Sequence, residues 1–320
     1  MIKQLKWPIS LAVLALVLVL LEPERILAEV HRLHPGWLAL ALTVTAGQTL
    51  LSAWRWRFTT TRLGLYLPWR QAIGDYYLAS FANQTLPGGV LGDAWRAQRH
   101  ARRTQSAQQQ PFEGHRNQRG TAWRAVLIER GSGQLLVIGL SLISLLVLNQ
   151  WLGPINPLLG TSEPAALGNI LGVVALLAAL IFGLTVTSFR RWQHHWVRFR
   201  ADVYTAVLSR EALAPQLASS LVIVVSYAAV FALAARAIGV DLQAAVLLSL
   251  ALPVLLVMLI PLSIAGWGWR EAAAGGLWMS LGLPPEQGVA VSMAYGGIVF
   301  LGASPGLIVW LTRPERPLPD

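Results

Sequence analysis

Long apolar runs separated by short polar segments dominate the chain. A helix needs about 17 to 25 predominantly apolar residues to cross the hydrocarbon core of a bilayer. Five runs are this long, at residues 37–54, 131–148, 167–187, 217–235 and 289–311. The pattern predicts an all-α fold, a polytopic transmembrane helical bundle.

A further run near the N-terminus is short. Residues 7–21 follow Lys3 and Lys6, so they could form a signal peptide or an uncleaved anchor. The nearest cleavage-like site, at residues 26–28, lacks a small residue at its first position, which favours the anchor.

Two membrane segments are expected to be re-entrant or broken. Residues 244–265 contain Pro253 and Pro261, which predict a helix that ends irregularly inside the membrane and a broken segment at 253–271. Residues 72–93 lie between two basic regions that should share one side of the membrane, and they are interrupted by Asp75, Asn83, Gln84, Pro87, Gly88 and Gly89. A re-entrant hairpin satisfies both observations, and about seven spans are expected in total.

Basic residues predict the orientation. Lys3 and Lys6 place the N-terminus in the cytoplasm, and the Arg-rich segment 96–130 is expected to be a basic cytoplasmic loop. The chain is interpreted as a single integral membrane domain, 1–320, with a first half at about 1–150 and a second half at about 215–312. No stretch between apolar runs reaches the ~100 residues of a usual catalytic domain.

The composition narrows the function. Only 12% of the 320 residues are charged, about half of the roughly 25% in soluble domains, which excludes a soluble globular protein. The net charge of +10 is mostly arginine and favours anionic lipid headgroups over nucleic acid. The absence of cysteine excludes disulfides and thiolate catalysis, and we expect neither a metal site nor a cofactor.

An internal repeat links the two broken segments. PGGVLGDAWR at residues 87–96 and PLSIAGWGWR at residues 261–270 share Pro, Gly, Trp and Arg at identical spacing. A duplication would place two broken segments beside a shared centre, as in secondary transporters. The alternative is that Pro and Gly simply mark helix ends.

Ionisable residues cluster around these broken segments. Because charge is costly inside a bilayer, such residues are candidates for function. Arginine suits phosphate, and carboxylates can orient arginine or attract a cationic headgroup. The candidate headgroup-binding residues are Asp93, Arg96, Glu129, Arg130, Arg270 and Glu271. Alternatively, these residues reach toward water or form salt bridges that fasten the hairpin to the following span.

Three other basic segments have simpler interpretations. Two segments, at residues 190–200 and 54–57, combine basic and aromatic side chains, which is typical of anchoring at the membrane interface. Residues 99–119 are rich in Gln and Arg, and we expect a disordered loop that contacts lipid or a partner protein.

Three segments resemble the transmembrane region of lysylphosphatidylglycerol synthases and their flippase-like relatives. They are SFANQTLPGGVLGDAWR, AVLIERGSG and IPLSIAGWGWREAAAGGLWMSLGLP. The resemblance implies an inner-membrane protein that moves or presents a lipid or lipid-linked headgroup between leaflets. It also implies a pathway shaped by Asn83, Pro87, Gly88, Gly89, Gly92, Pro261, Gly266 and Gly268. The soluble domain that performs aminoacyl transfer in the synthases has no counterpart in this sequence, so we do not expect that reaction.

Three functions stay open from the sequence. The first is a flippase-like transporter of phospholipid that does not use ATP, with Arg96 and Arg270 holding the phosphate. The second is a membrane transferase acting on a lipid-linked substrate, for which only Asp93, Glu129 and Glu271 are suitably placed. The third is a non-transporting partner of a lipid-modifying synthase or glycosyltransferase, docking through residues 99–119.

Overall fold

The computed structural model describes residues 34–86, 89–106, 118–152, 189–259 and 265–312, and every regular element in these ranges is helical. Four helical stretches are long and apolar enough to cross a membrane. They are α3 (Pro35–Arg62), α6 (Gln118–Leu152), α9 (Arg210–Ala237) and the pair α12 (Pro285–Ala303) and α13 (Pro305–Thr312). These helices contain four of the expected runs, so the all-α membrane bundle is confirmed. The runs at 7–21 and 167–187 lie outside the described residues.

The segment expected as a re-entrant hairpin consists of two packed helices, α4 (Trp69–Thr85) and α5 (Leu91–Ser106). Because α5 continues to Ser106 and α6 begins at Gln118, the expected loop at 96–130 is helical at both ends. The loop prediction was wrong for these parts because Asp75 of α4 attracts Arg99 and Arg103, which lie one turn apart on α5. Residues 107–117 lie outside the described part of the chain.

The second broken segment begins later than the sequence indicates. Helix α10 (Ala244–Leu256) passes through Pro253 and is extended by the 3-10 turn η3 (Val257–Leu259). Proline removes the hydrogen bond that the carbonyl four residues earlier would accept. Here that carbonyl belongs to Ser249, and the Ser144 hydroxyl of α6 donates to it at 2.5 Å. The helix therefore tolerates Pro253, while Pro261 lies outside the described residues.

The helix α11 (Trp269–Ser280) follows this break. Residues 265–268 turn into it, and Ala265, Gly266 and Gly268 have positive φ values of 51°, 81° and 85°. Glycine adopts this left-handed conformation without the Cβ clash that other residues meet. The two glycines thus allow the tight turn that leads into α11.

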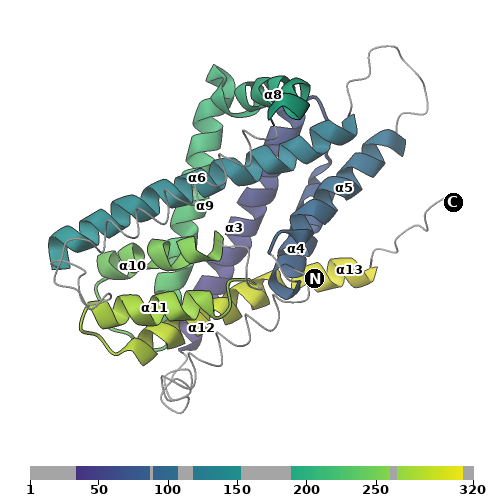
Figure 1. Cartoon of the computed structure of the whole chain (residues 1–320). Helices are drawn as coiled ribbons and strands as arrows, with labels where there is room; N and C mark the ends of the chain where they lie inside the picture. The colour runs from purple at the N-terminus through teal and green to yellow at the C-terminus, as the bar shows by residue number, and fades with distance from the viewer. Residues whose placement is uncertain (1–33, 87–88, 107–117, 153–188, 260–264, 313–320) are drawn as a thin grey trace.

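The described helices pack around a large apolar core and two smaller apolar clusters. Figure 1 shows α6 crossing the bundle in front of α3 and α9, with α10, α11 and α12 gathered at one end. Helix α3 packs along α9, and α10 packs on both α6 and α9. The large core includes Phe231 of α9, whose ring contacts those of Trp278 of α11 and Tyr295 of α12.

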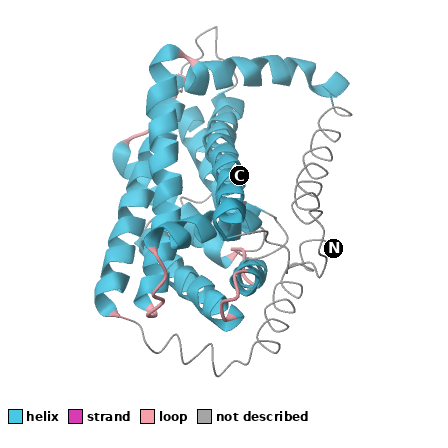
Figure 2. Cartoon of the chain, turned by 90° about the vertical axis from the view of Figure 1, so that its left-hand side faces the viewer, coloured by secondary structure: helices cyan, strands magenta, loops and turns pink. Residues whose placement is uncertain are grey.

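At the opposite end of the bundle, α8 (Phe189–Val203) is joined to α9 by the π-helical turn η2 (Tyr204–Leu208). Figure 2 shows α8 lying across this end of the bundle rather than along the long helices. Asp202 of α8 pairs with Arg124 of α6, and Arg62 of α3 donates to the Thr205 carbonyl oxygen of η2.

Candidate functional site

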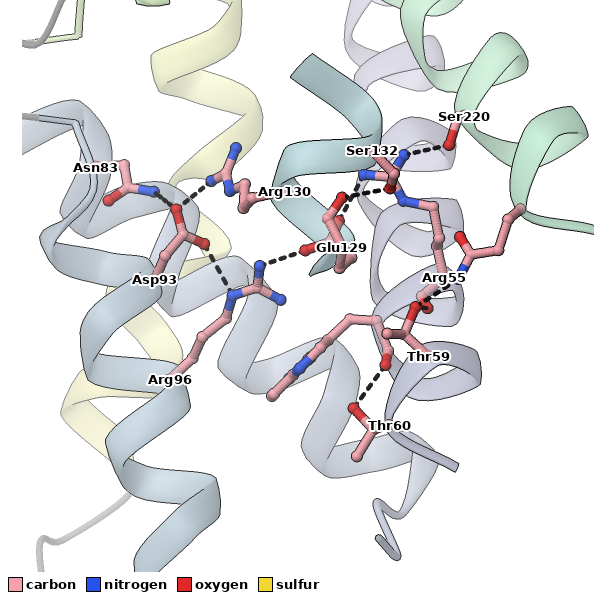
Figure 3. Close-up of polar contacts among 12 residues, drawn as sticks. Arg55, Thr59, Thr60, Asn83, Asp93, Arg96, Glu129, Arg130, Ser132 and Ser220 are labelled. Carbon is pink, nitrogen blue, oxygen red and sulfur yellow. Dashed lines mark hydrogen bonds and ion pairs between the residues drawn. The ribbon is translucent and has the colours of Figure 1, made fainter. Parts of the chain in front are cut away.

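A buried ionic network joins α5 to α6 (Figure 3). The Arg96 guanidinium donates to Asp93 at 2.8 Å and to Glu129 at 2.5 Å. Both Arg96 and Glu129 are 0% exposed. Removing either partner would leave an uncompensated buried charge, so the pair fixes the hairpin against α6.

Two more arginines extend the network. Arg55 of α3 donates to Glu129 at 2.6 Å and to the Ser220 hydroxyl of α9 at 2.8 Å. Arg130 of α6 pairs with Asp93 at 2.5 Å. Three guanidinium groups thus face two carboxylates, which leaves a net charge of +1. The Nε atoms of Arg55 and Arg130 are buried and have no hydrogen-bond partner among the described residues.

The tip of the hairpin is closed by polar contacts. Asn83 of α4 donates to Asp93 at 2.9 Å and accepts from the Gly92 amide at 2.8 Å. A Cβ on Gly92 would lie 2.1 Å from the Ala79 carbonyl oxygen, so only glycine allows α4 and α5 to approach this closely. Asn83 and Gly92 thereby hold Asp93 in place.

Arg96 is enclosed rather than open to a ligand. Its guanidinium lies 4.7 Å from the ring centre of Trp56 and 4.6 Å from that of Tyr76. Cation–π contacts of this kind stabilise a desolvated arginine. Because these rings and the carboxylates surround Arg96, its role is to hold Asp93 and Glu129 in position.

The second half of the chain contains a similar cage. Arg270 of α11 lies between the rings of Trp267 and Tyr295, at 5.0 and 5.3 Å. It donates to Glu271 at 2.7 Å and to the Ser292 hydroxyl of α12 at 2.8 Å. Glu271 also accepts from the Gly268 amide at 2.6 Å, which caps the N-terminus of α11.

In each half, therefore, the arginine that ends the repeated motif lies between two aromatic rings. Each also contacts the span that follows it, α6 for Arg96 and α12 for Arg270. A duplication would produce this correspondence, although the duplication itself stays a prediction.

A cavity of about 260 Å³ lies between the two broken segments. The tip of the first hairpin contributes Asn83, Gln84, Gly89 and Val90, and the second break contributes Met258, Ala265 and Gly266. Arg55 and Arg130 line the same cavity, together with three tyrosines, Tyr76, Tyr227 and Tyr295. The remaining wall is largely apolar and includes Val137, Ile223, Val224, Leu252, Leu255 and Val299.

Helix α3 supplies a polar wall that sequence reasoning missed. Thr45, Gln48, Thr49, Ser52 and Arg55 all line the cavity. Their spacing of three or four residues places them on one face of α3. The Thr45 and Thr49 hydroxyls donate to the carbonyls of residues 41 and 45, at 2.8 and 2.9 Å. Polar residues that recur with the period of a helix inside an apolar span are the sequence pattern from which this wall could have been predicted.

The expected anchoring by residues 54–57 is wrong for Arg55 and Trp56. Arg55 is 4% exposed, and Trp56 is fully buried. Adjacent helical positions point about 100° apart. An alternation of Trp and Arg therefore places Arg55 in the site, whereas Arg57 donates to the Leu67 carbonyl at the end of α3.

The structure separates the predicted site residues into two groups. Asn83, Gly89, Arg130 and Gly266 line the cavity, while Asp93, Arg96, Glu129, Arg270 and Glu271 are buried around it. Gly92 and Gly268 shape the backbone of the hairpin and of the turn before α11. Pro87, Gly88 and Pro261 lie outside the described residues. Within the described ranges, no three His, Asp or Glu side chains are grouped to hold a metal ion.

Comparison with known proteins identifies a family. The family model described as "Lysylphosphatidylglycerol synthase TM region" matches residues 7–306. Neither the search of curated proteins nor the search of solved structures found a match.

Proposed function

The chain belongs to the family of lysylphosphatidylglycerol synthase transmembrane regions, and on this premise we propose that it translocates or presents an anionic phospholipid or lipid-linked headgroup across the membrane. The family membership supports a multi-pass membrane protein related to lipid metabolism. The movement of lipid, the inner (plasma) membrane as its location and the cytoplasmic N-terminus are part of the proposal.

One observation carries the proposal: the net positive charge of the network beside the cavity. Arg55 and Arg130 line the cavity, each with an Nε that no described residue accepts from. Excess charge in a cavity between apolar helices is costly unless an anion compensates it. A phosphate is the anion that the forked guanidinium binds best.

In this mechanism Arg130 and Arg55 bind the phosphate, and Asp93 and Glu129 hold the two guanidinium groups in position. The polar face of α3 accommodates the rest of the headgroup, while the apolar wall lies next to the acyl chains. Arg96 and Arg270, first expected to hold the phosphate, act as positioning residues because rings and carboxylates enclose them.

The transferase alternative gains no support. The three acidic residues that it requires, Asp93, Glu129 and Glu271, are each hydrogen-bonded to an arginine. A general base needs a carboxylate that can reach a substrate proton. The partner alternative depends on residues 99–119, of which 107–117 lie outside the described residues.

The test uses purified protein in liposomes that carry fluorescent phosphatidylglycerol in both leaflets. An impermeant external quencher should extinguish more than the outer-leaflet half of the signal. In the Arg130→Gln variant, the rate should fall about 10- to 100-fold, the equivalent of one hydrogen bond to a charged group. Asp93 keeps Arg96 and Asn83 as partners in this variant, so the fold should survive.

Two further variants sharpen the result. Arg130→Lys keeps the charge without the fork and should retain an intermediate rate. Arg210→Gln removes one exposed charge at the start of α9 and should leave the rate unchanged. Quenching that stops at the outer-leaflet half would refute translocation, and an unchanged rate in Arg130→Gln would refute the site.

A further inference from the structure

Helix α8 is amphipathic, and none of its residues lines the cavity. Apolar residues recur in its sequence at intervals of three and four, at Phe189, Trp192, Trp196, Phe199 and Val203. This spacing forms one stripe along a helix. Arg190, Arg191, Arg198 and Arg200 fall outside this stripe, against one acidic residue, Asp202.

In the described part of the stripe, Trp196 is exposed, whereas Phe199 and Val203 are half-buried. Trp196 is 43% exposed, and its ring stacks on Phe199 with centres 5.7 Å apart. The contact that fastens α8 to α6 is made by Asp202, which lies six residues after Trp196 and so points about 120° away from it. The bundle therefore holds α8 by a face other than the one that carries Trp196.

The position of α8 limits what can cover the stripe. It lies across the end of the bundle (Figure 2), and the turn η2 that follows it contacts Arg62 at the end of α3. Residues 204–209 alone separate it from α9, so it lies within roughly 20 Å of the start of that span. The ends of spanning helices lie at the headgroup layer, where Trp is enriched and arginine meets lipid phosphates.

We propose that α8 is a second lipid-binding element, distinct from the cavity, which inserts its Trp–Phe stripe between the headgroups of anionic phospholipids at the membrane surface. The stripe supplies apolar area, and Arg198 and Arg200, both exposed, supply attraction to negative lipids. This inference does not depend on whether the protein moves lipid.

The test labels α8 at one point. Because the chain contains no cysteine, Trp196→Cys provides a single attachment site for an environment-sensitive fluorophore. The full-length protein is placed in vesicles of phosphatidylcholine alone or mixed with phosphatidylglycerol. We expect quenching by lipid-borne nitroxides to be stronger in the mixed vesicles and to weaken as salt is added.

Charge variants in the labelled protein separate the arginines of α8 from the total charge. Arg198→Gln should lower the ratio of inserted to withdrawn label about fivefold in mixed vesicles, the usual contribution of one cation at an anionic surface. Arg236→Gln removes one charge near the other end of α9 and should leave the ratio unchanged. Equal quenching in both vesicle types would overturn the requirement for anionic lipid. If aqueous iodide quenches the label and lipid-borne nitroxides do not, the insertion of α8 into the membrane surface is overturned.

Discussion

At the scale of single residues, arginine has two roles that sequence alone does not distinguish. Arg96 and Arg55 both stand beside tryptophan in the sequence. Their environments differ because the partners come from distant helices: Arg96 is enclosed by Trp56 and Tyr76, whereas Arg55 reaches Ser220 and the cavity. The clustering of charged residues could be predicted, because burying a single charged side chain inside a bilayer costs free energy. Which of these charged side chains face the cavity depends on how the helices pack, and the spacing of residues in the sequence does not determine that packing.

Glu129 connects the two kinds of arginine, so Glu129→Gln should be strongly destabilising. The neutral amide would leave Arg55 and Arg96 buried with too little negative charge, which typically costs about 3–5 kcal/mol. Thermal unfolding of the purified protein in detergent would measure this loss.

An exposed ion pair provides the comparison for Glu129. Glu211 bonds Arg62, but its side chain is 79% exposed. Glu211→Gln should therefore change stability by less than about 1 kcal/mol. Equal effects of the two substitutions would show that the Glu129 network contributes no more than a surface pair.

At the scale of helices, apolar length predicted the spans well, because crossing a membrane imposes a length. The predictions that relied on breaks and charges were weaker. Helix α5 continues past Arg96 because two of its arginines form ion pairs with Asp75 on α4. Helix α10 continues past Pro253 because the Ser144 hydroxyl donates a hydrogen bond to the Ser249 carbonyl. Both departures have the same origin: a neighbouring helix supplies the partner that the local sequence lacks.

Close helix approach gives a second test. Gly92→Ala should separate α4 from α5, because the added Cβ would meet the Ala79 carbonyl at 2.1 Å. We expect a loss of about 1–3 kcal/mol, the usual cost of overpacking, in thermal unfolding, together with slower lipid movement.

Gly47→Ala is the matched control, because nothing lies within 4 Å of the added Cβ on α3. Alanine favours helix over glycine by about 1 kcal/mol. Gly47→Ala should thus be neutral or stabilising, and a loss equal to that of Gly92→Ala would contradict the packing explanation.

At the scale of the whole molecule, the two broken segments meet at one cavity, so a headgroup there would contact both halves at once. Bound ligand should accordingly stabilise the entire fold. A ligand that binds only the folded protein raises the free energy of unfolding by RT ln(1 + [L]/Kd). This increase is about 2.7 kcal/mol when the ligand concentration is a hundred times Kd. Adding phosphatidylglycerol to the protein in detergent should raise the unfolding temperature more than phosphatidylcholine does.

The same titration with Arg130→Gln isolates the cavity from general effects of lipid on the micelle. The difference between the two lipids should shrink in this variant and persist in Arg210→Gln. If both variants respond as the unmodified protein does, the stabilisation arises elsewhere on the surface.

The threonines of α3 give the cavity a direction. Since the hydroxyl protons of Thr45 and Thr49 are donated within the helix, their oxygens offer only lone pairs to the cavity. Arg55, about 15 Å beyond Thr45 and about 9 Å beyond Thr49 along α3, offers only donors. Apart from the Gln48 amide, which can do both, one end of the wall therefore accepts hydrogen bonds and the other donates them. A guest molecule that is itself polarised, with oxygens at one end and hydrogens at the other, fits in one orientation and is mismatched when reversed.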